Sequence, residues 1–182
     1  APPYDIEHLE IRTSDVGSHV RLGSWRSVEF SHQGFFIESF IDELAHASGK
    51  DPVEFRLDAL AHAPRQHAVV QKAAQLAGWG SALPTGHGRG IALVEAFGTI
   101  VAEVAEVEVT AERQIRVHRV VAVVDCGEVI HPDTAAAQIE GGIVFGLAAA
   151  LLDEITIEKG RVVQSNFHDY PVPRIADTPR IQ

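Results

Sequence analysis

The sequence predicts an α+β fold, a two-layer arrangement of helices on a mostly antiparallel sheet. Two patterns carry this prediction. Apolar residues at helical spacing dominate residues 34–77, and β-branched runs separated by short polar turns dominate residues 91–124. With 182 residues, 46% of them hydrophobic, the chain is long enough to bury the core of one domain or of two small lobes. Helices segregated from an antiparallel sheet are typical of the two-layer α+β class.

The amino-terminal half is predicted to be helical after a short leading segment. Residues 8–13 alternate weakly in polarity, which favours a short strand. A helix is expected over residues 34–48, because apolar side chains recur there every three or four positions. Asp51 followed by Pro52 predicts a second helix, since the carboxylate can accept from unpaired amides and proline suits the first helical position. A third helix is expected over residues 64–77.

The carboxyl-terminal half is predicted to be rich in strands. Three strands, expected to be antiparallel, are predicted at residues 91–97, 100–109 and 115–124. The alanine-rich tract 132–152 is helical in composition, and a closing hairpin is expected around Lys159 and Gly160. A turn-rich stretch, residues 80–90, separates a strand plus helical lobe (1–80) from a β-rich lobe (81–182) with one glycine-containing helix. The other interpretation of this stretch is a surface loop within a single domain.

Charge and apolar run lengths exclude several functional classes. Fifteen Lys+Arg against 25 Asp+Glu give a net charge of −10, so nucleic acid is not an expected partner. The longest uncharged apolar run, residues 141–152, is shorter than the ~20 residues of a membrane-spanning helix, and the chain is expected to be soluble. The chain begins with Ala1 and contains no Met, which suggests a piece of a longer protein.

The sequence predicts neither a metal site nor cysteine chemistry. The ten histidines form no His-x-His or His-Glu-x-x-His pair, so they are expected to be surface or core residues. Cys126 is the only cysteine, so it cannot form an internal disulfide or hold an iron–sulfur cluster alone. It ends a β run and is interpreted as a buried small hydrophobe rather than a nucleophile.

Two segments carry residues suited to binding a ligand. The helix predicted over residues 132–152 contains Gly141, Gly142 and Gly146, and each mid-helix glycine costs about 1 kcal/mol relative to alanine. Either close helix–sheet packing or approach of the backbone to a flat or anionic ligand offsets that cost. Gln138 can pair with the donor–acceptor edge of a heterocycle, or it is simply a polar residue of the first turns. Trp25 and Arg26 form either the rim of a ligand-binding site or a cation–π pair on the surface.

Several motifs resemble those of one family in the same order along nearly the whole chain. They are Gly23-Ser24-Trp25-Arg26-Ser27-Val28, Glu38-Ser39-Phe40-Ile41-Asp42-Glu43-Leu44-Ala45, Asp51-Pro52-Val53-Glu54-Phe55-Arg56, Val124-Asp125-Cys126-Gly127 with Pro132-Asp133, Gln138-Ile139-Glu140-Gly141-Gly142 with Phe145-Gly146-Leu147, and Gln164-Ser165-Asn166-Phe167-His168-Asp169-Tyr170. The chain resembles the molybdopterin-binding large subunits of molybdenum hydroxylases, the superfamily of xanthine dehydrogenases and aldehyde oxidases. The branch it resembles most is the isoquinoline 1-oxidoreductase beta subunit.

This resemblance implies a reaction and its cofactors. The reaction is hydroxylation of an aldehyde or an N-heteroaromatic ring by water at a molybdenum–molybdopterin dinucleotide, expected to be of the cytosine type. Electrons would leave through [2Fe–2S] clusters on a separate small subunit, consistent with the single cysteine here. The implied partners are this small subunit, the remainder of the large subunit and a small aldehyde or N-heterocycle. A cytoplasmic or periplasmic location in bacteria is expected.

The resemblance also implies roles for individual residues. Gln138 matches a glutamine that hydrogen-bonds the pterin, and Arg26 matches an arginine whose segment lies beside the molybdenum. Gly141 and Gly142 lie in the matched motif and are expected to approach the cofactor. Val28 matches a wall position of the substrate pocket that is aromatic in xanthine dehydrogenases, which disfavours purine-like substrates, and the neighbouring Trp25 is assigned to the same wall.

The departures from the family pattern limit what this chain is expected to do. The family's catalytic glutamate, in a Gly-Glu-Pro motif, has no counterpart here, so no catalytic residue is assigned and the isolated chain is predicted to be inactive. The chain is therefore interpreted as an internal fragment of a molybdenum hydroxylase subunit that supplies part of the cofactor site. Its exposed apolar faces are expected to cause self-association. The rival hypothesis is a non-catalytic binding or assembly module that reuses the fold.

Overall fold

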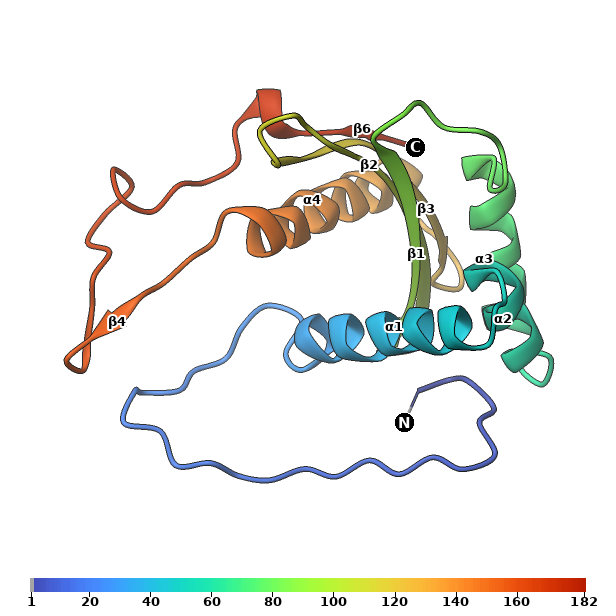
Figure 1. Ribbon diagram of the computed structural model, residues 1–182, viewed down its shortest axis with the longest axis horizontal. Helices are drawn as coiled ribbons and strands as arrows, with labels where there is room; N and C mark the ends of the chain where they lie inside the picture. Colours follow the sequence, from blue (N-terminus) through green and yellow to red (C-terminus); the bar gives the residue numbers. More distant parts are fainter. Residues whose placement is uncertain (1) are drawn as a thin grey trace.

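The computed structural model describes residues 2–182 and confirms the α+β class. In chain order the elements are α1 (Phe30–Ala47), α2 (Pro52–Ala59), α3 (Pro64–Ala77), β1 (His87–Ala96), β2 (Thr99–Val109), β3 (Ile115–Asp125), α4 (Pro132–Leu151), β4 (Ile157–Glu158), β5 (Arg161–Val162), a short 3-10 turn (Ile175–Asp177) and β6 (Arg180–Ile181). Figure 1 shows α3 on one side of the central sheet, with α4 and the segment that follows it on the other.

The central sheet has four strands in the order β1-β2-β3-β6. Strands β1, β2 and β3 pair antiparallel, as the sequence predicts, with His87 opposite Glu108 at one end of the β1–β2 pair. The short strand β6 runs parallel to β3 through only two paired positions. The sheet is therefore an antiparallel meander with a small parallel addition at one edge.

Local signals fix the starts and ends of the helices. The Asp51 carboxylate accepts hydrogen bonds from the backbone N–H groups of Val53 (2.8 Å) and Glu54 (3.2 Å), which confirms the predicted start of α2. Gly78 ends α3 in the left-handed region at φ 67°, a conformation that glycine adopts without steric cost. Helix α1 begins four residues before the predicted Gly34.

One hydrophobic core joins the helical segment and the sheet. Its buried members are Tyr4, Ile41, Val53, Leu60, Val69, Val70, Ala73, Ala74, Ala77, Ile91, Leu93, Ile100, Ala102, Val104 and Val121. These residues come from both sides of residue 80. The division of the chain into lobes 1–80 and 81–182 stays a prediction.

A charged network lies inside this core. The Glu38 carboxylate accepts hydrogen bonds from Tyr4 Oη (2.9 Å), Arg56 Nε (3.1 Å) and the backbone N–H of Leu93 (2.9 Å). The Arg56 side chain is completely buried and also donates to Asp42 Oδ1 at 2.6 Å. Burial raises the pKa of Glu38, and the neighbouring guanidinium opposes that shift. The network ties α1, α2 and β1 together.

Three predicted strand segments differ from the structure. Strand β1 begins at His87, four residues before the predicted start at residue 91, because residues 87–90 also pair with β2. Residues 8–13 form no strand, because this exposed segment has no partner strand to complete its backbone hydrogen bonds. The closing hairpin exists, but β4 and β5 have only two residues each. Lys159 and Gly160 form its turn with positive φ angles of 49° and 78°, which matches the predicted position.

Helix α4 is long, apolar and largely uncovered. The helix has 20 residues. Its most apolar 18-residue window has a mean hydropathy of 1.4, and only 11% of that window is buried. By length and composition this helix could cross a membrane, although it also carries Asp133, Gln138 and Glu140. The sequence-based criterion considered only the uncharged run 141–152 and therefore missed this property.

Candidate functional site

A cavity of about 430 Å³ lies between a loop before α1, one face of α4 and the segment that follows α4. It is lined by Trp25, Arg26, Gly141, Val144, Phe145, Ala148, Asp153, Tyr170, Val172 and Pro173. We call it the Trp25 cavity. Its walls combine apolar side chains with a guanidinium, a carboxylate and a phenol, the mixture expected of a small-molecule site.

The loop before α1 places Trp25 and Arg26 on α4. The Trp25 and Phe145 ring centroids are 5.5 Å apart, and the Arg26 guanidinium carbon lies 5.1 Å from the Phe145 ring centroid. Ser27 and Val28 have positive φ angles of 71° and 51°, and Val28 N–H donates to the Trp25 carbonyl at 3.0 Å. A β-branched residue in the left-handed region is strained, and such strain is concentrated at ligand sites. Arg26 therefore forms a cation–π pair with Phe145 rather than with its neighbour Trp25, the partner that the sequence suggested, and all three residues line the cavity.

The face of α4 that lines the cavity is partly bare. Gly141, Phe145 and Ala148 lie on one stripe of the helix, and the exposed Gln138 lies one turn before Gly141 on the same stripe. A Cβ atom added at Gly141, Gly142 or Gly146 would meet no atom within 4 Å. Packing within the described residues therefore does not require these glycines, and the backbone is open to a group from outside this chain.

The segment that follows α4 contributes an ionisable pair to the cavity. Desolvation, together with the nearby carboxylate of Asp153, raises the pKa of Tyr170 above its ordinary value. Tyr170 is therefore a neutral phenol at physiological pH. Together with Arg26, which also lines the cavity, these residues offer a permanent cation, a carboxylate and a hydroxyl to a polar ligand.

The structure brings together three of the six residues that the sequence singled out. Trp25, Arg26 and Gly141 line the Trp25 cavity, whereas Gln138, Gly142 and Val28 do not. Sequence reasoning did not select Phe145 and Tyr170 as site residues. Both lie in motifs that carried the resemblance, so their proximity to Trp25 was the missing information.

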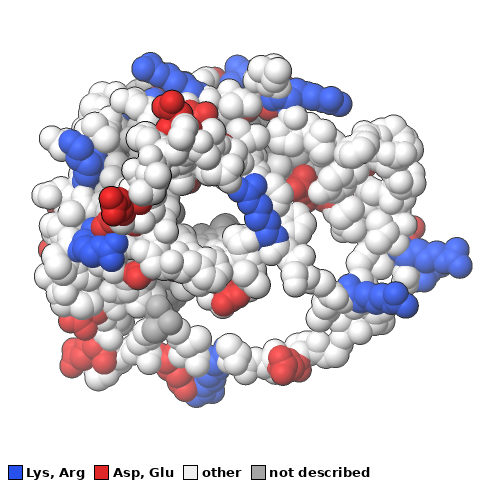
Figure 2. Space-filling view, turned by 180° about the vertical axis from the view of Figure 1, so that it is seen from behind, with Lys and Arg blue, Asp and Glu red and all other residues white. Residues whose placement is uncertain are grey.

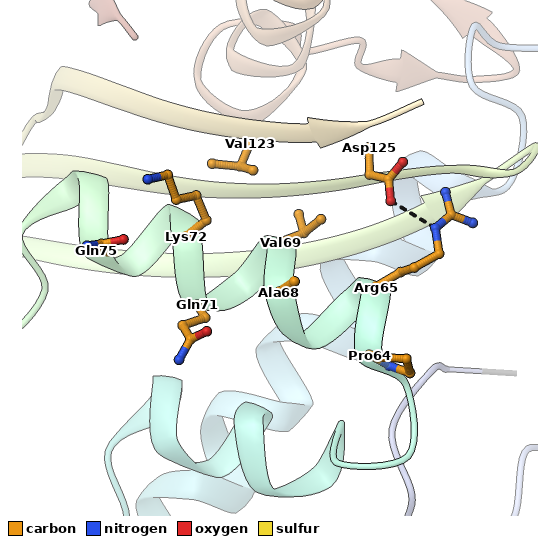
Figure 3. A pocket seen from close by; sticks show the side chains of 9 residues that line it. All are labelled: Pro64, Arg65, Ala68, Val69, Gln71, Lys72, Gln75, Val123 and Asp125. Atoms are coloured by element: carbon orange, nitrogen blue, oxygen red, sulfur yellow. Dashed lines mark hydrogen bonds and ion pairs between the residues drawn. The ribbon is translucent and has the colours of Figure 1, made fainter. Parts of the chain in front are cut away.

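A second, larger cavity of about 590 Å³ lies between α3 and β3 (Figure 3). Arg65 Nε and Asp125 Oδ2 form an ion pair at 2.8 Å at one end of it, and Lys72 lies along it. It contains none of the predicted site residues. Cys126, next to Asp125, is exposed, so the interpretation of this thiol as a buried hydrophobe is wrong. The turn after β3 leaves the core immediately beyond Asp125, which explains the exposure.

Comparisons with known proteins give the family. Residues 24–179 match the family model of the molybdopterin cofactor-binding domain. The chain is 38% identical over 98% of its length to the beta subunit of the isoquinoline 1-oxidoreductase of Brevundimonas diminuta. It is 32% identical over 99% of its length to one subunit of the nicotinate dehydrogenase of Pseudomonas putida. It is 33% identical over 98% of its length to a membrane-bound aldehyde dehydrogenase (pyrroloquinoline-quinone) of Gluconacetobacter polyoxogenes.

The chain spans only part of these curated relatives. It covers 23%, 17% and 26% of their respective lengths. The family match begins at Ser24, beside the two loop residues that line the Trp25 cavity, and includes all of α4. The chain belongs to the molybdopterin cofactor-binding domain family, as the motifs in its sequence predicted.

Proposed function

We propose that this chain supplies part of the cofactor site and one wall of the substrate funnel of a molybdenum hydroxylase. One observation supports this more than any other: the Trp25–Arg26 loop faces the glycine-bearing stripe of α4 in one cavity. An open glycine backbone, an amide side chain one turn away and a guanidinium are together suited to a pterin that carries phosphate groups. The residues present therefore fit the cofactor that the family binds.

The proposed reaction is the hydroxylation of an aldehyde or an isoquinoline-like N-heteroaromatic ring. A substrate C–H bond is replaced by C–OH with oxygen from water, and two protons and two electrons are released. When bound, the molybdenum cofactor, proposed to be a cytosine dinucleotide, supplies the two-electron oxidant. The electrons would pass to [2Fe–2S] clusters on a small partner subunit.

Each binding residue has a distinct task in this proposal. The Gln138 amide, exposed on α4, donates to and accepts from the pterin edge. The Arg26 guanidinium, held against Phe145, stabilises negative charge on the cofactor or substrate. Gly141 and Gly142 let an atom of the cofactor approach the helix backbone, since no side chain occupies that space.

Trp25 and Val28 would face the substrate. Trp25 offers a flat apolar surface in the cavity, and Val28, three residues further along the chain, is about half exposed. The small Val28 side chain provides no stacking surface, which favours aldehydes and isoquinoline-like rings over purines.

We propose that the remainder of the large subunit covers α4. Asp133, Gln138 and Glu140 lie in the first half of this helix, and ionisable groups are expensive inside a lipid bilayer. A neighbouring protein surface can pair with these groups while it buries the apolar stripe. In this arrangement the assembled enzyme is soluble, in the cytoplasm or the periplasm of a bacterium.

The first test uses the full-length subunit. We expect Gln138→Ala to lower the molybdenum and pterin content per subunit at least about tenfold, because a hydrogen bond to the cofactor is lost. Gln75→Ala, which removes an exposed amide on α3, is the matched control and should retain the wild-type content. Mass spectrometry measures molybdenum, and fluorescence measures oxidised pterin. Equal content in both variants would contradict the role of Gln138.

The second test uses the 182-residue chain alone. We propose that the catalytic base, a glutamate, lies elsewhere in the subunit, and a positioned base contributes about 10²–10⁴-fold to a rate. The chain should therefore show no turnover of aromatic aldehydes or quinoline-type rings with an artificial electron acceptor. Measurable turnover by this chain would overturn the assignment.

A further inference from the structure

Three side chains from three strands meet at one end of the central sheet. They are His87 at the start of β1, Glu108 near the end of β2 and His118 in β3. A ring nitrogen of each histidine and a carboxylate oxygen of Glu108 all lie within 4.8 Å of one another, and all three residues are half-buried. None of them lines the Trp25 cavity.

The backbone explains why these residues meet. His87 and Glu108 are paired directly across β1 and β2. Between β2 and β3 the register shifts, so that Glu106 pairs with Arg119 and Val107 with Val117. His118 is therefore the extra residue of a β-bulge, and a bulge redirects a side chain that regular alternation would place elsewhere.

The contacts within this cluster leave one nitrogen without a partner. His118 Nε2 lies 3.0 Å from Glu108 Oε2, and the two imidazole rings are stacked with centroids 4.9 Å apart. Nδ1 of His87 is buried and has no hydrogen-bond partner among the described residues. A buried nitrogen left unpaired is unfavourable, whereas two imidazoles and a carboxylate are the ligand set of zinc sites that keep one position open.

We propose that His87, Glu108 and His118 bind a divalent zinc ion. Tetrahedral zinc ligands at about 2.0–2.1 Å from the metal are separated by about 3.3 Å, so the ligand atoms here need only small side-chain rotations to close around the ion. The fourth position is left to water. Arg116 pairs with Glu108 in the strand register but is exposed, so solvent screens its charge.

The bound ion would join β1, β2 and β3 at a single point. This site goes beyond the proposed function, because it shares no residue with the Trp25 cavity and does not depend on molybdenum. It also departs from the sequence-based expectation of no metal site, which considered only histidines close together in the sequence.

The test is a zinc titration of the 182-residue chain after treatment with a chelator. We expect calorimetry to show one Zn²⁺ per chain and the melting temperature to rise with the metal, since an ion that binds only the folded state stabilises it. His118→Ala and Glu108→Gln should each weaken binding at least about tenfold. His62→Ala removes an exposed histidine outside the cluster and should bind as the wild type does.

Two further readouts make the result decisive. Glu108→Gln preserves the shape of the side chain, and circular dichroism of each apo variant separates loss of binding from loss of fold. Co²⁺ in the wild-type site should give the visible absorption of a four-coordinate ion, and His118→Ala should abolish it. The absence of Zn²⁺ binding in the wild type, or equal affinity in the wild type and His118→Ala, would overturn the proposal.

Discussion

At the scale of single residues, the buried ion network makes the sharpest prediction. Arg56→Ala should lower the free energy of unfolding by about 3–5 kcal/mol, because it leaves the buried Glu38 carboxylate without a counter-ion. Urea denaturation followed by circular dichroism measures the change. Lys50→Ala, which breaks the exposed pair with Asp58, should cost less than about 1 kcal/mol. If both variants lost the same free energy of unfolding, burial of the Arg56–Glu38 pair would not explain its contribution to stability.

Single residues also show what a sequence can and cannot predict about a site. Asp51 accepts hydrogen bonds from backbone amides only two and three positions away, so its capping role could be predicted from the sequence. The contact of Trp25 with Phe145 and the stacking of His87 on His118 depend on chain segments far apart in sequence. No local spacing encodes such contacts, and only the resemblance pointed to Trp25, Arg26 and Gly141 as members of one site.

At the scale of the element, helix α2 depends on its first residues. Asp51→Ala should lower the free energy of unfolding by about 1–2 kcal/mol. The Asp51 carboxylate caps two backbone amides and also accepts a hydrogen bond from Trp79 Nε1 at 2.9 Å. Asp51→Asn retains a side-chain oxygen that can accept these hydrogen bonds, so it should lose less stability than the alanine variant. Thermal unfolding of both variants measures the difference. An alanine variant as stable as the asparagine variant would exclude a capping role.

The central sheet should lose stability in acid. Partial burial raises the pKa of Glu106, but ion pairs with Arg89 Nε (3.1 Å) and Arg119 Nη2 (3.4 Å) outweigh it and hold this pKa below the ordinary value of 4.5. A lowered folded-state pKa stabilises the fold above the unfolded-state value, and this contribution is lost as the pH falls through the folded-state value. The stability advantage of the wild type over Glu106→Gln should therefore be full at neutral pH and shrink below pH 4.5.

Denaturant unfolding at a series of pH values measures this advantage. A difference between the two proteins that does not change with pH would show that the ion pairs of Glu106 do not stabilise the sheet.

Elements with strong periodicity were predictable, and elements that depend on a partner were not. The three long strands and α1 to α4 follow from apolar spacing and from Pro and Gly at helix ends. Residues 8–13 have strand-like alternation but no neighbour to pair with. Strand β6 is a strand only because β3 offers a free edge to Arg180 and Ile181. Pairing is a property of tertiary structure, so the local pattern wrongly predicted a strand at residues 8–13 and gave no sign of β6.

At the scale of the whole molecule, the surface combines scattered charges with uncovered apolar side chains. Figure 2 shows basic and acidic groups interspersed over one face. Phe35, Phe36 and Phe40 of α1 are each more than half exposed, and α4 is largely uncovered. Exposed apolar patches of this kind mark surfaces that bind other protein.

We predict that the isolated chain self-associates through these apolar faces. Its average mass in light scattering should rise with concentration, and replacing Phe36 and Phe40 with serine should weaken the association at least about tenfold. The control is Phe97→Ser, which removes an exposed ring at the β1–β2 turn. A monomeric mass at every concentration would contradict the prediction.

The contact between Glu38 and the Leu93 amide also occupies a backbone donor on an outer strand of the sheet. Strand β1 is an outer strand of the sheet, and free amides on such a strand can template the addition of strands from other molecules, as in amyloid. The Glu38 carboxylate occupies the amide of Leu93 in β1, and α1 crosses that strand near its carboxyl end (Figure 1). The acid that neutralises Arg56 thus also blocks strand addition at one point on this edge of the sheet.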